Sequence, residues 1–283
     1  MTTIQTIGVI GSGQMGAGIA QVCATAGLQV ILYDIAENQL AKAKTGIEKS
    51  LLKLAEKEKI TEEQRLQVVK NLKTTIKMED LASADFCIEA ATEKKDLKGE
   101  LFHELSHITR PAVVLASNTS SIPITELGEF THRPDKVIGM HFMNPVPLME
   151  CVEVISGRQT SSQTMATTLE LAKKLGKTPV AVKDSPGFVV NRILMPMINE
   201  AVYALEAGLA TKEDIDKAMK ISCNFPMGPL TLADFIGLDT CLFILEVMER
   251  DLKDKKFKPS PLLKKYVKEG RLGRKTKEGF YKY

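Results

Sequence analysis

Short apolar runs alternate with longer amphipathic stretches along the chain up to Lys183. Short runs bounded by polar residues predict buried strands, whereas apolar residues that recur every three or four positions predict helices with one buried face. The stretch 37–58 is of the second kind, since its apolar positions Leu40, Ile47 and Leu51 fall on one side of a helix. Strands that alternate with helices predict a mostly parallel sheet covered by helices.

The order of these elements divides the chain into two domains. We expect strands at 7–10, 29–33, 85–90, 112–116, 136–140, 151–155 and 178–182, and between them helices that include 37–58, 62–72, 96–108 and 162–175. After Lys183 the apolar spacing is helical, through 188–206, 211–219, 230–236, 239–251 and 262–268. We place the boundary at Pro186, which predicts an α/β domain at 1–185 and an all-helical domain at 186–283.

A glycine-rich turn joins the first predicted strand to the first predicted helix. Gly11 permits the tight turn, Gly13 lets the backbone approach a pyrophosphate, and Gly16 lets the helix lie close to the strand. The unpaired N–H groups that begin a helix favour an anion. We therefore predict a Rossmann-type, doubly wound domain with a dinucleotide on this turn, contacted by Gly11, Ser12, Gly13, Gln14, Met15 and Gly16.

Asp34 closes the second predicted strand and indicates which dinucleotide is bound. A carboxylate at this position accepts hydrogen bonds from the adenosine ribose hydroxyls and repels a 2′-phosphate, so we expect NAD rather than NADP. An ordinary glycine-rich turn is the alternative, but it would explain neither the helix that follows nor the acid at the end of the next strand.

Polar residues also follow other predicted strands. Ligands of a parallel sheet lie across the carboxyl ends of its strands, so we expect Glu93 and Lys98 near the nicotinamide half of the cofactor. The segment 117–121 brings hydroxyl and amide groups to the same edge, and Ser120 belongs to it. Such a cluster is equally ordinary in loops and at helix N-termini, and both interpretations stay open.

His141 and Glu153 form a candidate acid–base pair. Glu153 lies among apolar residues of a predicted strand, and a buried carboxylate needs a partner. His141 is the nearest titratable candidate, on what we expect to be an adjoining strand. An imidazole with its ordinary pKa of about 6.5 can take and return a proton at neutral pH, which fits hydride transfer between a secondary alcohol and a ketone. A satisfied core histidine is the alternative for His141.

Two further residues fit this chemistry. Ser120 and Asn191 can donate hydrogen bonds to the substrate oxygen, where negative charge gathers during reduction. Asn191 lies in the first turn of the helix that follows the domain boundary. A nucleotide site, an acid–base pair and these donors together suggest an alcohol–ketone oxidoreductase.

Lys49, Lys53 and Lys57 recur every four residues along the helix 37–58, with Ser50 nearby. Such a charged stripe is usually a solvated face. The other interpretation is a surface that receives a polyphosphate.

Composition excludes several other classes of protein. A net charge of +3 without a basic block gives no argument for nucleic-acid binding. The 5 cysteines are scattered without a C-x-x-C pair, so neither a disulfide framework nor a zinc site is indicated. We expect a cytoplasmic protein with no membrane segment, since neither a leader nor a long apolar run appears.

The chain resembles the L-3-hydroxyacyl-CoA dehydrogenase family over essentially its whole length, and most closely the short bacterial members that act on 3-hydroxybutyryl-CoA. The matching motifs are Gly11–Gly18, Ser117–Ser121, His141–Pro145, Val152–Val154, Asp184–Phe188, Asn191–Arg192, Pro226–Pro229 and Gly273–Tyr281. Met143 departs from the pattern, where a second phenylalanine is usual; because both side chains fill similar space, this bears at most on the acyl pocket.

The resemblance implies a role for each matching residue. His141 is then the acid/base, Glu153 its partner, and Ser120 and Asn191 contact the reacting group. The implied NAD contacts are Asp34, Glu93, Lys98, Ser120, Asn144 and Lys275, and the implied coenzyme A contacts are Ser50, Lys53, Lys57 and Ser120. The implied reaction interconverts (S)-3-hydroxyacyl-CoA and 3-oxoacyl-CoA with NAD(H), in a homodimer formed through the helical domain.

Two rival functions stay open. A dehydrogenase of the same fold that acts on a free hydroxy acid or sugar acid would not need Lys49, Lys53 and Lys57. A catalytically silent nucleotide-binding protein would have no use for His141 and Glu153 together.

Overall fold

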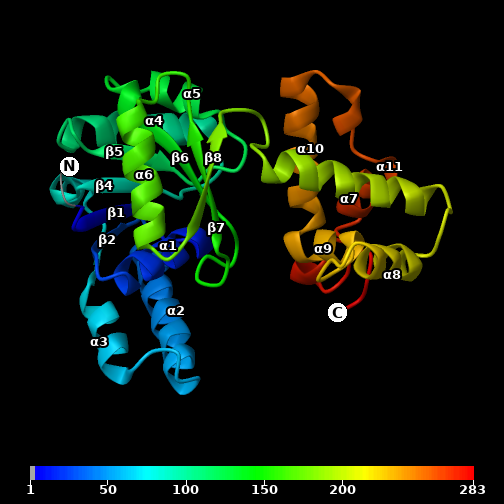
Figure 1. The fold of residues 1–283 in the computed structure, drawn as a ribbon, viewed down its shortest axis with the longest axis horizontal. Coiled ribbons are helices and arrows are strands. Elements are labelled where there is room, and N and C mark those ends of the chain that lie inside the picture. The colour runs from blue at the N-terminus through cyan, green and yellow to red at the C-terminus, as the bar shows by residue number, and fades with distance from the viewer. Residues whose placement is uncertain (1–3) are drawn as a thin grey trace. The chain divides into compact units, whose positions relative to one another are not determined.

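The computed structural model describes residues 4–283, which fold into two compact units (Figure 1). The first unit ends at Ser185, and the second spans Pro186–Tyr283. In the described part of the chain no helix combines the length and the apolar composition that a membrane span requires.

One sheet of 8 strands organises the first unit, as described from residue 4 onward. Its spatial order is β3 (Leu72–Thr75), β2 (Gln29–Tyr33), β1 (Thr6–Ile10), β4 (Phe86–Glu89), β5 (Val114–Ser117), β6 (Val137–Phe142), β7 (Cys151–Ser156) and β8 (Thr178–Lys183). Neighbouring strands run parallel except β6 and β7, which are antiparallel. The expected mostly parallel, doubly wound sheet is therefore confirmed.

Helices cover both faces of this sheet (Figure 1). They are α1 (Gln14–Thr25), α2 (Glu37–Glu56), α3 (Glu62–Lys70), α4 (Lys95–Ile108), α5 (Ile124–Glu129) and α6 (Ser162–Lys174), joined by the 3₁₀ turns η1 (Met78–Ser83) and η2 (Pro134–Lys136). Side chains of α1, α2 and α6 share one hydrophobic cluster with the sheet. The central strands read as nearly continuous apolar runs because helices bury them from both sides.

The strand β3 corrects the sequence prediction, which extended the helix 62–72 to this point. The helix α3 ends at Lys70, and β3 pairs with β2 in parallel from Leu72 to Thr75. Its residues Lys73 and Thr74 are polar because an edge strand is only partly covered, so the segment lacks the apolar run that marks a buried strand.

The second unit is built of helices, as expected, with two isolated β-bridges between 273 and 282. It contains α7 (Val190–Glu206), α8 (Lys212–Ser222), α9 (Pro229–Ile236), α10 (Leu238–Leu252) and α11 (Pro261–Lys268), with the 3₁₀ turns η3 (Lys255–Phe257) and η4 (Arg274–Thr276). Met195, Ile198, Leu230 and Leu245 are buried in its core. The carboxylate of Asp234 accepts hydrogen bonds from the backbone of Phe280 and Tyr281 and from the Tyr283 hydroxyl, which fastens the end of the chain to α9.

Candidate active site

The glycine turn after β1 has the geometry that a bound pyrophosphate requires. Gly11 has a φ of +95°, and a Cβ at this position would lie 2.7 Å from the Ala90 carbonyl oxygen. A Cβ at Gly16 would collide with the carbonyl of Gly11. At Gly13, by contrast, a Cβ would meet nothing within 4 Å among the described residues, so this position is open to a ligand. The start of α1 has no side-chain cap, which leaves its N–H groups for an anion.

Asp34 lies beside this turn, directly after β2. Its Oδ2 accepts hydrogen bonds from the backbone N–H of Ser12 at 2.8 Å and from the Ser12 hydroxyl at 2.7 Å. Its Oδ1 accepts from the N–H of Ala36 at 3.0 Å. These bonds hold the carboxylate at the edge of the turn, where the ribose of a dinucleotide would reach its remaining lone pairs.

His141 and Glu153 face each other across the antiparallel strands β6 and β7, where they are register partners. The His141 Nδ1 and the Glu153 Oε2 are 2.8 Å apart, and both side chains are buried. Because a carboxylate only accepts, the neutral ring carries its proton on Nδ1 and its basic lone pair on Nε2. The structure thus brings together the two residues that the sequence suggested as a pair.

Glu93 is surrounded by the loop that follows β5. Its Oε1 accepts hydrogen bonds from Thr119, Ser120 and Ser121, among them the Ser120 N–H at 2.9 Å. Burial raises the pKa of Glu93, but the Lys98 ammonium and these donors outweigh it, and the net effect lowers the pKa. Glu93, Lys98 and Ser120, which the sequence placed at the same edge of the sheet, are thus joined in one charged network.

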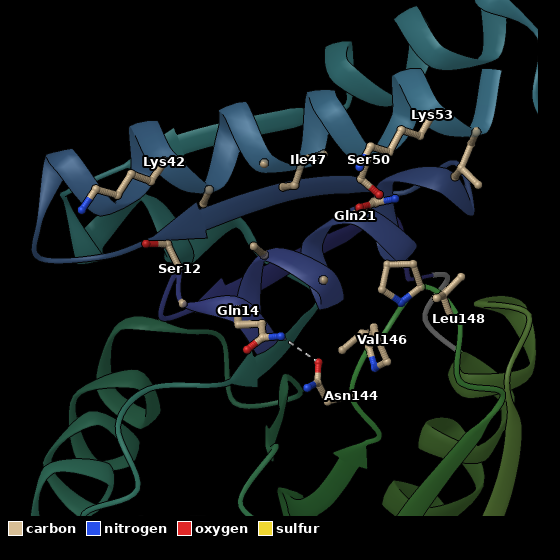
Figure 2. A pocket seen from close by; sticks show the side chains of 18 of the residues that line it. Ser12, Gln14, Gln21, Lys42, Ile47, Ser50, Lys53, Asn144, Val146 and Leu148 are labelled. Carbon is tan, nitrogen blue, oxygen red and sulfur yellow. Dashed lines mark hydrogen bonds between the residues drawn. The ribbon is translucent and has the colours of Figure 1, made fainter. Parts of the chain in front are cut away.

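A cavity of about 610 Å³ extends from the glycine turn along α2 (Figure 2). Its walls come from α1, α2 and the loop that follows β6. Figure 2 shows Ser50 and Lys53 on α2 above this cavity and the Gln14 amide bonded to Asn144 below it, with Gln14 Nε2 and Asn144 Oδ1 3.1 Å apart. The cavity therefore connects the predicted cofactor contacts of the turn with the predicted coenzyme A contacts of the helix.

The cations that line the cavity differ in part from the predicted stripe. Lys53 and Lys57 line it, but Lys49 is not among its lining residues. Lys42 and Lys59 line it as well, and the sequence interpretation missed both. A mixed spacing of three and four residues along α2 would have identified Lys42, whereas Lys59 follows the end of the helix and carries no periodic signal.

Lys177 is a third residue that the sequence interpretation missed. Its ammonium donates to the carbonyls of Val146 at 2.6 Å and Met149 at 2.8 Å, and so holds the loop that forms one wall of the cavity. Burial lowers the pKa of Lys177, and nearby Glu150 opposes this effect. No local sequence pattern links a lysine before β8 to that loop.

Asn191 and Lys275 belong to the second unit. Asn191 is buried in the first turn of α7. The Lys275 ammonium forms an ion pair with Asp239 at 2.5 Å. Their contribution to the site of the first unit stays a prediction.

Among the described residues, no group of three or more His, Cys, Asp or Glu side chains is arranged to hold a metal ion.

Comparisons with known proteins identify relatives of this chain along its whole length. Models of the 3-hydroxyacyl-CoA dehydrogenase NAD binding domain and C-terminal domain match residues 6–185 and 187–283. The chain is 55% identical to the probable 3-hydroxybutyryl-CoA dehydrogenase of Deinococcus radiodurans, over 98% of this chain and 99% of that protein. It is 49% identical to the 3-hydroxybutyryl-CoA dehydrogenase of Bradyrhizobium diazoefficiens, over 99% of this chain and 96% of that protein. The crystal structure of (S)-3-hydroxybutyryl-CoA dehydrogenase from Ralstonia eutropha has a TM-score of 0.97 and 49% identity, and covers 99% of both chains.

Proposed function

Since the chain belongs to the 3-hydroxyacyl-CoA dehydrogenase family and is an NAD-dependent oxidoreductase, we propose that it interconverts (S)-3-hydroxybutyryl-CoA and acetoacetyl-CoA. NAD, when bound, accepts the hydride from the substrate's third carbon, or NADH returns it. The turn Gly11–Gly16 and Asp34 would hold this cofactor, which fits the open backbone at Gly13.

The observation that carries the mechanism is the buried contact between His141 and Glu153. In the oxidative direction the Nε2 of His141 takes the hydroxyl proton, and in the reductive direction the same atom returns a proton to the alkoxide. Glu153 holds the ring through Nδ1 and stabilises the imidazolium that forms, as an acid does in a hydrolase triad. General base catalysis of this kind contributes roughly 10²- to 10⁴-fold to the rate.

We assign Ser120 and Asn191 as the donors to the reacting oxygen. Glu93 fixes Ser120 by accepting its backbone N–H at 2.9 Å. The Ser120 hydroxyl donates to the same carboxylate at 3.3 Å and would turn from it to the reacting oxygen when substrate binds. A fixed donor stabilises developing negative charge more effectively than water, which must reorganise.

The coenzyme A part of the substrate would lie along α2. Ser50, Lys53 and Lys57 line the cavity together with Lys42 and Lys59, so cationic groups outnumber acids along this wall. Their ammonium groups favour the phosphates of the coenzyme, and the apolar wall from Ile47 and Val146 would cover its uncharged parts.

A direct assay tests the proposal. NADH consumption is followed with acetoacetyl-CoA, with longer 3-oxoacyl-CoA esters and with free acetoacetate at equal concentrations. We expect turnover of the thioester to exceed that of the free acid by at least about 100-fold, because the free acid lacks every contact to the cavity. Equal turnover of the free acid would favour the rival free-acid dehydrogenase.

We extend the proposal to a homodimer formed through the second unit. Exposed apolar side chains of this unit include Ile193, Leu209, Ile221, Phe235 and Phe243, and pairing of two chains through this unit would cover them. Light scattering after size-exclusion chromatography measures the mass directly. A cytoplasmic location stays a prediction from the sequence.

A further inference from the structure

Glu89 is a fully buried carboxylate that has no place in the mechanism above. It is the last residue of β4 and is 0% exposed. Its Oε1 accepts hydrogen bonds from the Lys98 ammonium at 2.5 Å and from the Ala91 N–H at 2.6 Å. Its Oε2 accepts from the Ser117 hydroxyl at 2.6 Å. A buried charge is costly unless it is paired and hydrogen-bonded, and Glu89 meets both conditions.

Lys98 links the carboxylate of Glu89 to a second carboxylate, that of Glu93. The Lys98 ammonium is buried, and besides Glu89 it contacts the Ala91 carbonyl and the Oε2 of Glu93, each at 3.2 Å. Two of the three N–H groups of this ammonium donate hydrogen bonds, to Glu89 and to the Ala91 carbonyl, and Glu93 is held as an ion pair. Lys98 therefore bridges two acids.

Glu93 in turn fixes the loop that carries Ser120. Its Oε1 receives the Ser120 N–H at 2.9 Å, the Ser121 N–H at 3.2 Å and the hydroxyls of Thr119, Ser120 and Ser121. The other oxygen of Glu93 is held by Lys98. The Glu93 carboxylate is thus held by Lys98 through Oε2 and orders the loop through Oε1.

Glu89 also reaches the same loop at its beginning. Ser117, which donates to Glu89, accepts a hydrogen bond from the Thr119 N–H at 3.1 Å. The backbone carbonyl of Glu89 accepts from the Asn118 N–H at 2.8 Å. The loop is therefore tied to Glu89 directly at Ser117 and Asn118, and through Lys98 and Glu93 at its later residues.

We propose that Glu89 is a positioning residue that acts by a relay. Its charge holds Lys98, Lys98 holds Glu93, and Glu93 fixes the backbone of the loop at Ser120. The proposal rests on the proposed function only in that Ser120 serves the reacting oxygen. A neutral Glu89 would leave Lys98 paired with Glu93 alone, free to draw that carboxylate out of the loop. A displacement of about 1 Å at a reacting group can cost on the order of 100-fold in rate.

The first test needs neither cofactor nor substrate. Hydrogen exchange of residues 117–122 is measured by mass spectrometry in the wild-type protein and in Glu89→Gln, which has nearly the same shape. We expect this segment to exchange at least about tenfold faster in the variant, because the amides of Ser120 and Ser121 lose their fixed acceptor. Unchanged exchange in this segment would overturn the relay.

Asp85→Asn is the matched control, because Asp85 lies at the opposite end of the same strand. Its carboxylate accepts from the backbone of Gln5 and Thr6 and pairs with Arg110, so the variant loses a comparable set of contacts. We expect exchange at 117–122 to stay within about twofold of the wild type, since local opening reports local contacts. Equal acceleration by both variants would mean that the sheet loosens as a whole, and would overturn the proposal.

Kinetics then separate positioning from general damage. Glu89→Gln is expected to lower kcat about 10- to 100-fold, with the KM for acetoacetyl-CoA within about threefold of the wild type. In a Ser120→Ala background the same change should cost less than about threefold, because residues that act through one another are not additive. Additive losses would overturn the relay to Ser120.

The remaining outcomes are also decisive. Faster loop exchange in Glu89→Gln together with full activity of Ser120→Ala would support the positioning of the loop and refute the proposed role of Ser120. If Glu89→Gln does not fold, the double variant Glu89→Gln/Lys98→Met removes both charges of the buried pair and should show the same faster exchange. Exchange like that of the wild type in this double variant would overturn the proposal.

Discussion

The imidazole of His141 and the carboxylate of Glu153 meet as register partners of two antiparallel strands, with Nδ1 and Oε2 2.8 Å apart. The backbone ladder, rather than a flexible loop, therefore fixes the distance between the proposed base and its partner. Both strands are buried, so the pair is also shielded from bulk water.

The variant His141→Gln tests the base. We expect kcat to fall by about 10²- to 10⁴-fold, because no other group at this position can exchange the substrate proton. The dissociation constant of NADH, measured by fluorescence titration, should stay within about threefold of the wild type. His107→Gln changes an exposed histidine on α4 and should leave both quantities unaltered. Activity of His141→Gln at the wild-type level would exclude His141 as the base.

The variant Glu153→Gln tests the partner. An amide can present its NH₂ group to Nδ1 and favour the wrong tautomer, so we expect kcat to drop by about 10- to 1000-fold with little change in NADH affinity. Stopped-flow kinetics with acetoacetyl-CoA would measure the loss of the chemical step. A normal kcat in this variant would mean that Glu153 has a structural role only.

The cavity wall predicts a specific effect of charge reversal. Lys53→Glu/Lys57→Glu should raise the KM for acetoacetyl-CoA by about tenfold, because partly exposed ion pairs contribute up to about 1 kcal/mol each. Lys49→Glu alters the same helix outside the cavity lining and serves as the control. The increase in KM of the double variant should become smaller as ionic strength rises. Equal KM values for both variants would argue against coenzyme binding along α2.

Cofactor selectivity should depend on Asp34. We expect Asp34→Asn to raise the KM for NADH and lower the KM for NADPH, so that the preference for NADH falls by at least about tenfold, since the repulsion of a 2′-phosphate is removed. Asp85→Asn removes a carboxylate that precedes β4, at the end of the sheet opposite to Asp34, and should keep the preference. The ratio of kcat/KM for the two cofactors measures this, and an unchanged ratio for Asp34→Asn would contradict it.

The lowered pKa of Glu93 predicts how stability depends on pH. The folded state favours the ionised form more than the unfolded chain does, so the stabilisation is fully present above about pH 5 and is lost as the pH falls through the folded-state value. Glu93→Gln should therefore lower the melting temperature at pH 7 and lower it less at pH 4. Calorimetry at both values measures this. An equal decrease at both would mean that the charge of Glu93 does not contribute.

The sequence predicted what depends on local pattern and missed what depends on distant contacts. The alternation of residues along β7 was enough to place Glu153 on a face with apolar neighbours, as an acid that needs a partner, because side chains of a strand alternate with period two. The polar strand β3 was missed because its edge position removes the apolar signal. No sequence pattern indicated the contacts of Glu89, which ends an apolar run, since its partners Lys98 and Ser117 come from other elements.

The eight residues between β6 and β7, positions 143–150, lie outside the interstrand pairing that sets His141 opposite Glu153. Their side chains can therefore change without altering the register of this pair. This connection also forms one wall of the cavity, through Val146 and Leu148. A substitution in this connection would thus reshape the cavity wall and leave the proposed acid–base pair in place.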